Sequence, residues 1–535
     1  MAENYKDRIV MIPFMAQGHI IPFLALALQL EQRKNYCITF VNTPLNIKKL
    51  KLSLPHNSSI HFLEFPFNSL DYGLPPNIEN TDSLPYSLIL TFLESSLALK
   101  PTFKKLISAL VQEPYGKPPL CIMTDMFFSW CAEIAHEFGI FHSIFCAGGG
   151  YGFACFYSLW LNLPHNNTDS EEFILPDFPE ASKIHVTQMT DFLRAATGKD
   201  SCSIFQKNML LGWLNADGIL FNTAEELDKL GLMYFRRKIG KPVWSIGPVL
   251  LSSANRAKAA NTAEVCKKWL DRKPLNSVLY ICFGSQNTIT ASNIMQLAKA
   301  LEASGKNFIW VVRPPLGFDL NSEFQEKEWF PEGFEERIRS SGKGLLVQKW
   351  APQMEILSHK SVSAFLSQCG WNSVLEALSC GVPIIGWPLA AEQFYNVKLL
   401  EEEIGVCVEV GRGKTCEVGH QVIETKIELV MNEEQKGREL RRKACEIRDV
   451  IKEAIKWDEG FFRVTSVKAM DEFLDSALLM RRKIKMCPNG EVQSQNLEKN
   501  RTKVLNPNSK EMVVESSNNE KARETNNIGW NDNPP

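Results

Sequence analysis

The sequence predicts an α/β protein with two doubly wound parallel sheets that face each other across a cleft. Short apolar runs alternate with longer helical patterns, which is typical of α/β units with parallel strands. This alternation stops near residue 250 and then restarts, and 535 residues are too many for a single core. Ligands of open α/β sheets bind beyond the carboxyl ends of the strands, so we expect the functional site in the cleft.

In the first half, five apolar runs are predicted strands: 8–13, 37–42, 120–124, 143–146 and 218–222. The stretch 9–30 is broken by prolines and polar residues and has no small-residue cleavage site, so it is interpreted as strand, turn and helix rather than signal peptide. Residues 1–249 form the predicted first domain. Residues 250–276 form the predicted linker, because 250–266 is small and polar without a strand pattern.

The second half repeats the pattern, with predicted strands at 277–283, 307–312, 344–348, 363–366 and 382–387. Residues 277–455 form the predicted second domain, and 456–480 are predicted to be C-terminal helices that return to the first. From residue 481 Asn, Lys, Ser and Glu dominate, and Trp530 is the only aromatic residue. Because such a tail buries little apolar surface, 481–535 is predicted to be disordered.

Composition excludes several classes of protein. Formal net charge is −2, from 59 basic and 61 acidic residues, which argues against a nucleic-acid binder. The 14 cysteines are scattered without a CxxC pair, which favours buried thiols in a reducing, cytoplasmic setting over zinc or redox sites. No apolar run reaches the length of a membrane span. No DxD occurs, so we expect no metal-chelating carboxylate pair.

Two strand-to-helix turns carry candidate chemistry. In FMAQGHIIP, 14–22, His19 follows a strand and enters a helix, where the helix terminus disfavours imidazolium and suits a base. A capping or core histidine fits this spacing equally well. In CFGSQ, 282–286, Gly284 permits a tight turn and Ser285 offers a hydroxyl to an anion, although the same pattern is a common helix cap.

A third turn lies in FLSQCGWNS, 365–373. Gly370 bends the chain, and Asn372 and Ser373 begin a helix whose donors would meet phosphate oxygens. Glu376 lies on the same helix face and could accept bonds from a sugar diol. An ordinary capped helix is the alternative. The glycine run AGGGYG, 147–152, does not fit the GxGxxG of a dinucleotide site and reads as a turn passing close to a ligand or another backbone.

The stretch WAPQMEILSHKSVSAFLSQCGWNSVLEALSCGVPIIGWPLAAEQ, 350–393, resembles the signature box of plant UDP-dependent glycosyltransferases. The WAPQ start, CGWNS core, GVP and final EQ all agree, and GHxxP at 18–22 extends the resemblance to about residue 480. This family has the GT-B fold of two facing Rossmann-like domains. The resemblance implies a first domain that binds the acceptor and a second that binds the UDP-sugar.

The resemblance also implies roles for individual residues of the box and for Ser285. Trp350 would stack on the uracil, at roughly 1–3 kcal/mol. Ala351 and Gln353 would bond the edges of the uracil and ribose, and Glu376 would bond the ribose hydroxyls. The diphosphate would be held without metal by Ser285, Asn372 and Ser373. The sugar would be bordered by Trp371, Glu392 and Gln393. A final glutamine is the family's usual companion of glucose.

His19 matches the family's general base, and Asp125 matches the acid that orients it. The implied reaction is inverting transfer of glucose from UDP-glucose to a hydroxyl or carboxyl of a small lipophilic metabolite, such as a flavonoid, terpenoid or phenolic, to give a β-glucoside. We expect the enzyme to need no cofactor, and we expect it to be a monomer. The alternative is a non-catalytic sugar-nucleotide-binding or regulatory protein, which the presence of both residues disfavours.

Gln368 departs from the family, which usually has histidine there. Glutamine keeps an N–H donor but carries no charge, and a charged hydrogen bond is worth roughly 1.5–3 kcal/mol against about 1 for a neutral one. We therefore expect a working enzyme with a weakened diphosphate contact. The acceptor pocket is expected near 65–80, 148–156 and 187–192. Five aromatic residues are candidates for its lining or for core: Phe127, Phe128, Tyr151, Phe153 and Phe156.

Overall fold

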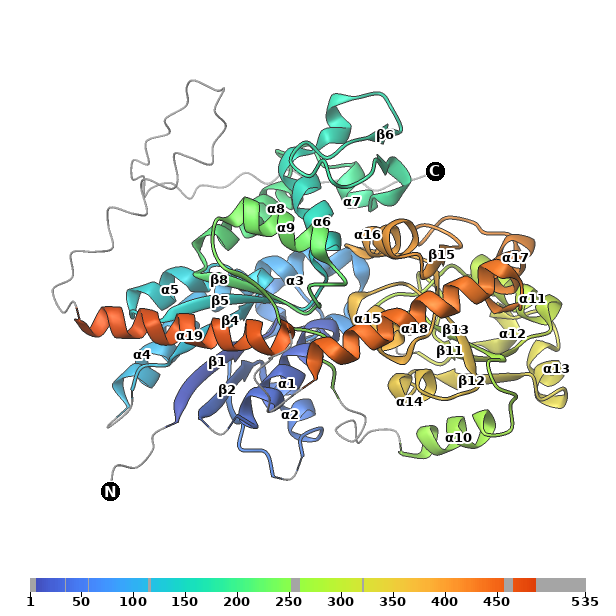
Figure 1. Cartoon of the computed structure of the whole chain (residues 1–535), viewed down its shortest axis with the longest axis horizontal. Coiled ribbons are helices and arrows are strands. Elements are labelled where there is room, and N and C mark those ends of the chain that lie inside the picture. The colour runs from blue at the N-terminus through green and yellow to red at the C-terminus, as the bar shows by residue number, and fades with distance from the viewer. Residues whose placement is uncertain are drawn as a thin grey trace. The chain divides into compact units, whose positions relative to one another are not determined.

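The computed structural model describes residues 6–33, 35–55, 57–113, 117–251, 260–319, 322–456 and 465–486. The described residues up to Arg482 pack as one compact unit, and beyond it only the last residues of helix α19 (Thr465–Met486) are described. This part of the chain contains two parallel sheets surrounded by helices (Figure 1). The predicted α/β class is confirmed.

The first sheet has seven strands in the order β3-β2-β1-β4-β5-β8-β9, all parallel. Its strands are β1 (Asp7–Ile12), β2 (Tyr36–Asn42), β3 (His61–Glu64), β4 (Cys121–Asp125), β5 (Phe141–Cys146), β8 (Gly218–Phe221) and β9 (Val243–Ser245). The five predicted strands are all present. Sequence patterning missed β3, because this edge strand is short and has no fully buried residue.

Helices cover both faces of this sheet. Successive residues of β1 point to opposite faces, so Ile9 and Met11 pack with α1 and α19, whereas Val10 and Ile12 pack with α3, α4 and α5. The helices of this half are α1 (Gln17–Glu31), α2 (Pro44–Lys51), α3 (Ile89–Ser95), α4 (Lys100–Gln112), α5 (Cys131–Glu137), α6 (Gly150–Asn162), α7 (Asp191–Arg194), α8 (Ser201–Gly212) and α9 (Lys229–Ile239). A small antiparallel pair, β6 (Glu172–Phe173) and β7 (Ile184–His185), was not predicted.

The second sheet has six parallel strands in the order β12-β11-β10-β13-β14-β15. They are β10 (Val278–Cys282), β11 (Asn307–Val312), β12 (Gly344–Gln348), β13 (Val362–Ser367), β14 (Ile384–Gly386) and β15 (Cys407–Glu409). The predicted strands 307–312 and 344–348 have the observed bounds. The three-residue strand β15 was missed because so short a run shows no clear period.

The helices of the second half correct the predicted linker. They are α10 (Ala260–Leu270), α11 (Ala291–Ser304), α12 (Glu326–Trp329), α13 (Phe334–Ser340), α14 (Gln353–Leu357), α15 (Trp371–Cys380), α16 (Gln393–Lys398), α17 (His420–Met431) and α18 (Gln435–Ile455), with a π-helical turn at Leu399–Ile404. Helix α10 lies inside the predicted linker 250–276, where Cys266 and Leu270 are buried at helical spacing against the second half. Residues 252–259 lie outside the described residues.

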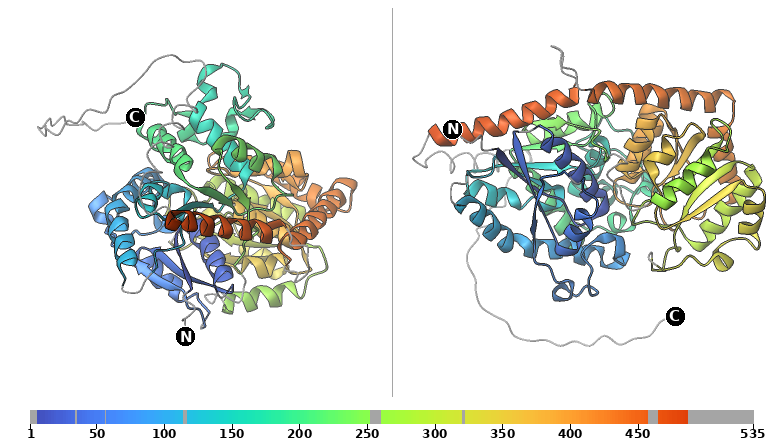
Figure 2. Two further views of the ribbon diagram at one scale, coloured as in Figure 1. Left: turned by 60° about the vertical axis from the view of Figure 1, so that its left-hand side comes forward. Right: turned by 90° about the horizontal axis from the view of Figure 1, so that it is seen from below.

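The last two helices run along both halves of the molecule (Figures 1 and 2). Helix α18 packs on the second half, and α19 packs on the first sheet, where Phe473 meets the rings of Phe141 and Trp244. Helix α19 continues to Met486, past the predicted start of the tail at residue 481. Arg481 within it forms two 2.8 Å hydrogen bonds with Asp7. The rest of the predicted tail lies outside the described residues.

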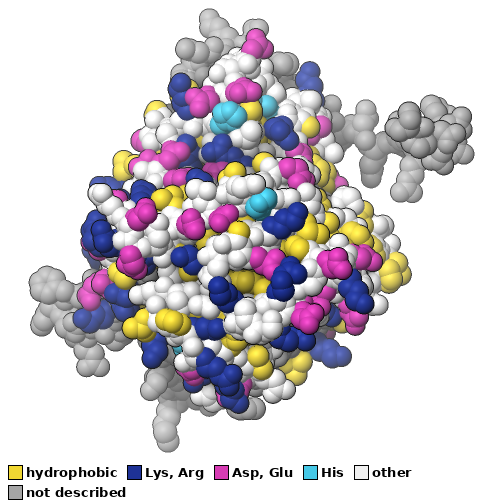
Figure 3. All heavy atoms as spheres, turned by 90° about the vertical axis from the view of Figure 1, so that its right-hand side faces the viewer, with side chains coloured by type: hydrophobic (Ala, Val, Ile, Leu, Met, Phe, Trp, Pro, Cys, Tyr) yellow, Lys and Arg dark blue, Asp and Glu magenta, His cyan; other side chains and the backbone are white. Residues whose placement is uncertain are grey.

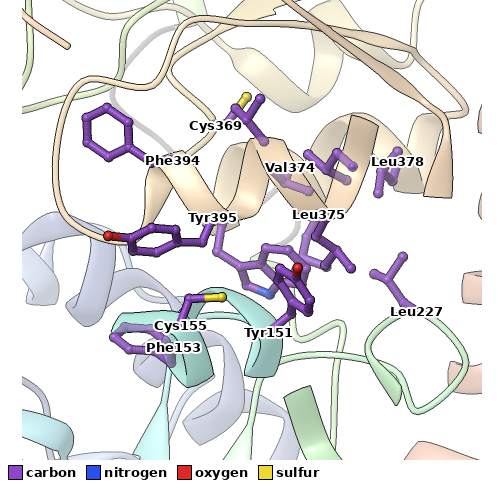
Figure 4. Close-up of a cluster of buried hydrophobic side chains, with 14 of the residues drawn as sticks. Tyr151, Phe153, Cys155, Leu227, Cys369, Val374, Leu375, Leu378, Phe394 and Tyr395 are labelled. Atoms are coloured by element: carbon purple, nitrogen blue, oxygen red, sulfur yellow. The ribbon is translucent and has the colours of Figure 1, made fainter. Parts of the chain in front are cut away.

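The two halves meet through a buried apolar cluster. Figure 4 shows Tyr151 and Cys155 of α6 lying toward Leu375 of α15 and Tyr395 of α16. The glycine run 147–152 makes this approach close: a methyl group at Gly152 would lie 2.2 Å from Oδ1 of Asn396. Gly150 to Gly152 belong to α6 and not to the predicted turn, and Gly152 packs closely against the other half of the molecule.

Acidic and basic side chains are interspersed on the face of the second half shown in Figure 3. That distribution matches the balanced composition of the chain. No single sign of charge gathers into a stripe on this face.

Candidate active site

One cavity of about 760 Å³ is lined by residues of both halves. Its walls include His19 and all of the residues predicted to bind a UDP-sugar, namely Ser285, Trp350, Ala351, Gln353, Gln368, Trp371, Asn372, Ser373, Glu376, Glu392 and Gln393. Parallel strands bring these positions together, because the turns after β10 and β13 leave the same edge of the second sheet. The cavity is large enough for a nucleotide and a second small molecule.

The His19 side chain lies at the start of α1, three residues after the N-cap Ala16, and 24% of it is exposed. Its Nδ1 lies 2.7 Å from Oδ2 of Asp125, the fully buried last residue of β4. Because a carboxylate only accepts, Nδ1–H is the donor and the lone pair of the neutral ring is on Nε2. The rings of Phe14 and Phe127 lie 5.8 and 5.7 Å from the imidazole and 4.7 Å from each other, so they pack on the same side of it.

Several charges act on this imidazole. Burial lowers the pKa of His19, but the carboxylates of Asp125 and Glu392 oppose it, and the net pKa is raised above the ordinary 6.5. Burial also raises the pKa of Glu392, and the nearby His19 offsets part of that rise. The carboxylates therefore outweigh the effect of burial on the pKa of His19. His19 is thus a stronger base than a free histidine.

The turn after β10 differs in one respect from the sequence prediction. Gly284 has φ +78°, as the predicted tight turn requires, and Ser285 lines the cavity. No helix follows directly, because α11 begins at Ala291 and is capped by the side chain of Thr290. Ser285 is therefore part of a loop and does not cap a helix.

Gln368 occupies the space above this glycine. It is 7% exposed, and its Oε1 accepts a 3.3 Å hydrogen bond from the hydroxyl of Ser367. A methyl group at Gly284 would lie 2.2 Å from Nε2 of Gln368. The amide N–H₂ thus lies between the two turns that the sequence assigns to the diphosphate.

Helix α15 begins with open backbone donors. Its N-cap is Gly370, whose lack of a side chain leaves the first N–H groups of the helix without a side-chain cap. Asn372 reaches across the cleft, and its Nδ2 donates to the carbonyl oxygen of Gly18 at 2.8 Å. The terminus of this helix suits an anion.

One turn further along α15, Glu376 is buried in a polar network. Its Oε2 accepts from Nε2 of Gln353 at 2.7 Å, and the same nitrogen donates to Oγ of Ser373 at 3.0 Å. Oε1 of Gln353 accepts from the hydroxyl of Tyr280 at 3.2 Å. Both ends of the Gln353 amide are thereby engaged by the protein.

The remaining predicted residues differ in how free they are. Trp350 is 40% exposed and presents a flat face, as a stacking residue needs. Trp371 is 3% exposed, and its Nε1 donates to the carbonyl of Asn222 at 2.7 Å, so it forms a wall of the cavity. Oε1 of Gln393 accepts from the amides of Leu389 and Ala390, both at 3.0 Å, which leaves its Nε2 as the group able to meet a ligand.

The five aromatic candidates of the first half differ in their surroundings. Phe153 lines the cavity, and Phe127 is partly buried beside His19. Phe128 and Tyr151 are core residues, at 1% and 0% exposure. Phe156 is partly buried and packs on Phe153 with ring centroids 6.0 Å apart.

Tyr280 and Arg313 are among the cavity residues that the sequence prediction did not name. Tyr280 is the one polar side chain in the apolar run of β10, and Arg313 follows β11 directly, at the edge where ligands of such sheets bind. The position of Arg313 could have been found from that placement alone, because it directly follows the end of β11. The guanidinium of Arg313 donates to the carbonyl of Lys349, next to Trp350, at 2.7 Å.

Two kinds of feature are absent from the residues that the structure describes. These residues contain no group of three or more His, Cys, Asp or Glu side chains arranged to hold a metal ion. Among the described helices, none combines the length and apolar character that crossing a membrane requires.

Comparison with known proteins agrees with this geometry. The family described as "UDP-glucoronosyl and UDP-glucosyl transferase" matches residues 253–441. UDP-glycosyltransferase 92A1 of Arabidopsis thaliana is 50% identical over 480 residues, which cover 89% of this chain and 98% of that protein. Crocetin glucosyltransferase 3 of Crocus sativus is 43% identical over 452 residues, covering 81% and 92%. The crystal structure of Medicago truncatula UGT71G1 complexed with UDP-glucose matches with a TM-score of 0.73 at 26% identity, covering 89% of this chain and 99% of that one.

Proposed function

The chain belongs to the plant UDP-dependent glycosyltransferase family with its GT-B fold, and from this premise we propose that it moves glucose from UDP-glucose to a hydroxyl or carboxyl of a small lipophilic metabolite. The product is a β-glucoside. The carrying observation is the 2.7 Å contact between Nδ1 of His19 and Asp125, which leaves Nε2 as the basic atom of a residue that lines the cavity. A binding-only protein would need no base that is oriented in the cavity in this way.

The reaction begins when Nε2 of His19 takes the proton of the acceptor hydroxyl. The freed oxygen attacks the anomeric carbon, and UDP leaves from the opposite face, so an α-linked donor gives a β-linked product. Asp125 holds the ring in the required tautomer and stabilises the imidazolium that forms. A positioned base of this kind contributes about 10²–10⁴-fold to the rate.

The second half is assigned to the donor. Trp350 stacks on the uracil, with Ala351 at its edge, and Glu376 accepts from the ribose hydroxyls. Ser285, Asn372, Ser373 and the open N-terminus of α15 hold the diphosphate, and Gln368 adds a neutral donor. Trp371, Glu392 and Gln393 surround the sugar. In this assignment these groups stabilise the negative charge on the leaving UDP, and no metal is needed.

The first half is assigned to the acceptor. Phe153 and the partly buried Phe127 give the cavity an apolar, aromatic side near His19, which suits a flavonoid, a terpenoid or another phenolic. Both walls of the cavity belong to one chain, which supports a monomer as the working unit. The thirteen described cysteines are free thiols, which supports a reducing compartment such as the cytoplasm.

A product assay by mass spectrometry tests this proposal. The purified chain is mixed with UDP-glucose and a panel that contains crocetin, a flavonoid and simple phenols, beside His19→Ala. His420→Ala is the matched control, because His420 also begins a helix but lies outside the cavity. We expect a new glycoside from the unmodified chain and from His420→Ala, with a β anomeric proton by NMR.

His19→Ala should lose that product by about 10²-fold or more. No glycoside from any acceptor, while UDP-glucose still binds, would reject catalysis and favour the binding-only alternative.

A further inference from the structure

Tyr280 lies beneath the donor side of the cavity and belongs to no predicted site. It is in the middle of β10 and is 1% exposed, and its ring stacks on Phe365 of the neighbouring strand β13 at a centroid distance of 4.9 Å. Its hydroxyl donates to Oε1 of Gln353 at 3.2 Å. Because this buried hydroxyl bonds to a side chain of the binding site and not to the backbone, it can orient that side chain.

The partner is the amide of Gln353, which has two different ends. Nε2 donates to Oε2 of Glu376 at 2.7 Å and to Oγ of Ser373 at 3.0 Å. A carboxylate accepts only, so the nitrogen has to face Glu376 and the oxygen has to face Tyr280. If the amide turned over, its oxygen would lie against the carboxylate oxygen and repel it.

The protonated phenol keeps this orientation. Burial raises the pKa of Tyr280 well above its ordinary value of 10, which favours the protonated hydroxyl that donates to Gln353. The chain Tyr280–Gln353–Glu376 is therefore polarised in one direction, and each hydrogen bond strengthens the next. Gln353, assigned from the sequence to uracil and ribose edges, has both ends of its amide engaged within this chain.

We propose that Tyr280 is a positioning residue that acts through Gln353 to aim the carboxylate of Glu376 at the ribose diol of the nucleotide. The inference rests on the proposed function, because it takes Glu376 as the acceptor of the ribose hydroxyls. It assigns recognition of a ribonucleotide over a deoxyribonucleotide to a three-residue chain that begins at the centre of the second sheet. Tyr280 acts through the hydrogen bond from its hydroxyl to Gln353.

The test compares the affinities for UDP and for 2′-deoxyuridine diphosphate, measured by calorimetry on the full chain and on Tyr280→Phe. The two nucleotides differ by one hydroxyl, and the variant differs by one buried oxygen while keeping the stacked ring. We expect the unmodified chain to prefer UDP by about tenfold or more, the size of one charged hydrogen bond. Tyr280→Phe should weaken UDP binding about 3- to 10-fold and leave deoxy-UDP binding within about 2-fold.

Tyr157→Phe is the matched control, because the hydroxyl of Tyr157 also makes one buried bond, to the carbonyl of Leu210 at 3.1 Å, away from the cavity. It should change neither affinity. Gln353→Leu removes the middle of the chain and should reproduce the selective loss, which keeps the test decisive if Tyr280→Phe folds poorly. Added to Glu376→Gln, Tyr280→Phe should have no further effect, because both act on one contact.

The outcomes separate the two claims. If Tyr280→Phe weakens both nucleotides equally, or if neither it nor Gln353→Leu reduces the preference for UDP, Tyr280 is only structural and the inference is overturned. If the unmodified chain binds no UDP, the donor assignment in the proposed function fails. If it binds both nucleotides equally, the role of Glu376 fails and the inference fails with it, although a product assay can still support glycosyl transfer.

Discussion

The side chain of Asn372 ties the two halves of the active site together, since its Nδ2 lies 2.8 Å from the carbonyl oxygen of Gly18. Gly18 precedes His19, and Asn372 is the second residue of α15. The amide has two N–H groups, so one can hold this carbonyl while the other meets a phosphate oxygen. The hydrogen bond thereby sets the distance between the base and the proposed diphosphate site.

The first prediction is that Asn372→Ala lowers kcat/KM for UDP-glucose about tenfold or more. Two hydrogen bonds worth about 1 kcal/mol each are lost, and about 1.4 kcal/mol corresponds to tenfold. Steady-state kinetics and the Kd of UDP should show a larger loss in kcat than in UDP affinity, because UDP binding needs only the phosphate contact.

Asn372→Asp should be worse than Asn372→Ala, because a carboxylate repels both the Gly18 carbonyl and the phosphate. An Asn372→Ala enzyme with unchanged kcat but a weakened Kd would show that Asn372 binds UDP without aligning His19.

The second prediction concerns pH. The pKa of His19 is raised above 6.5 by Asp125 and Glu392 against the effect of burial, and the base must be unprotonated. Activity should therefore rise with pH on a limb centred above 6.5. Asp125→Asn removes the largest raising influence, so its limb should move to lower pH while the maximal rate falls. A profile of kcat/KM between pH 5 and 9 measures both effects.

The chain supplies a control for this experiment. His136 and Asp217 form a second His–Asp contact at 3.0 Å, outside the cavity. Asp217→Asn should leave the position of the limb unchanged. A limb that stayed in place in Asp125→Asn would contradict the assignment of the limb to His19.

The same pair should also affect stability. A histidine whose folded-state pKa is raised stabilises the fold below the pKa of the unfolded chain, and this contribution is lost as pH rises through the folded pKa. The His19–Asp125 contact should therefore stabilise the protein most in mild acid. The difference in Tm between the unmodified chain and Asp125→Asn should be larger at pH 5.5 than at pH 9. An equal difference at both values would indicate that His19 does not titrate in this range.

The third prediction is that Gln368→His tightens the diphosphate contact. Nε2 of Gln368 lies above Gly284 between the two turns assigned to the diphosphate, and histidine places an N–H donor there that can also carry charge. We expect kcat/KM for UDP-glucose to rise by up to about tenfold, with the larger gain at lower pH where imidazolium is populated. Gln368→Met, which removes the donor, should lower it. Equal kinetics in all three proteins would mean that residue 368 does not limit catalysis.

The sequence predicted the site better than it predicted the connections that orient it. The turns that carry His19 and Gln368 could be predicted because each follows an apolar run and contains a distinctive residue. The contact of Asn372 with Gly18 joins positions 354 residues apart, and no local pattern encodes such a pairing. Tyr280 was missed for a related reason, because a tyrosine in a strand reads as core until its hydroxyl partner is known.

The glycine run at 147–152 also makes a long-range contact that no local pattern encodes, and the last prediction concerns Gly152 in this run. Replacing a glycine inside a helix by alanine normally stabilises a protein by about 1 kcal/mol. At Gly152 of α6 the sign should reverse, because the new methyl group would lie 2.2 Å from Oδ1 of Asn396 in the buried contact between the halves. We expect Gly152→Ala to lower Tm by several degrees.

Gly18→Ala is the matched comparison, since Gly18 is also helical but the nearest neighbour of its new methyl group would be 4.0 Å away. The Tm of this variant should stay the same or rise. Thermal unfolding by circular dichroism measures both variants. Equal or higher stability in Gly152→Ala would show that α6 and α16 can separate without cost, which is incompatible with a closely packed contact between the two halves.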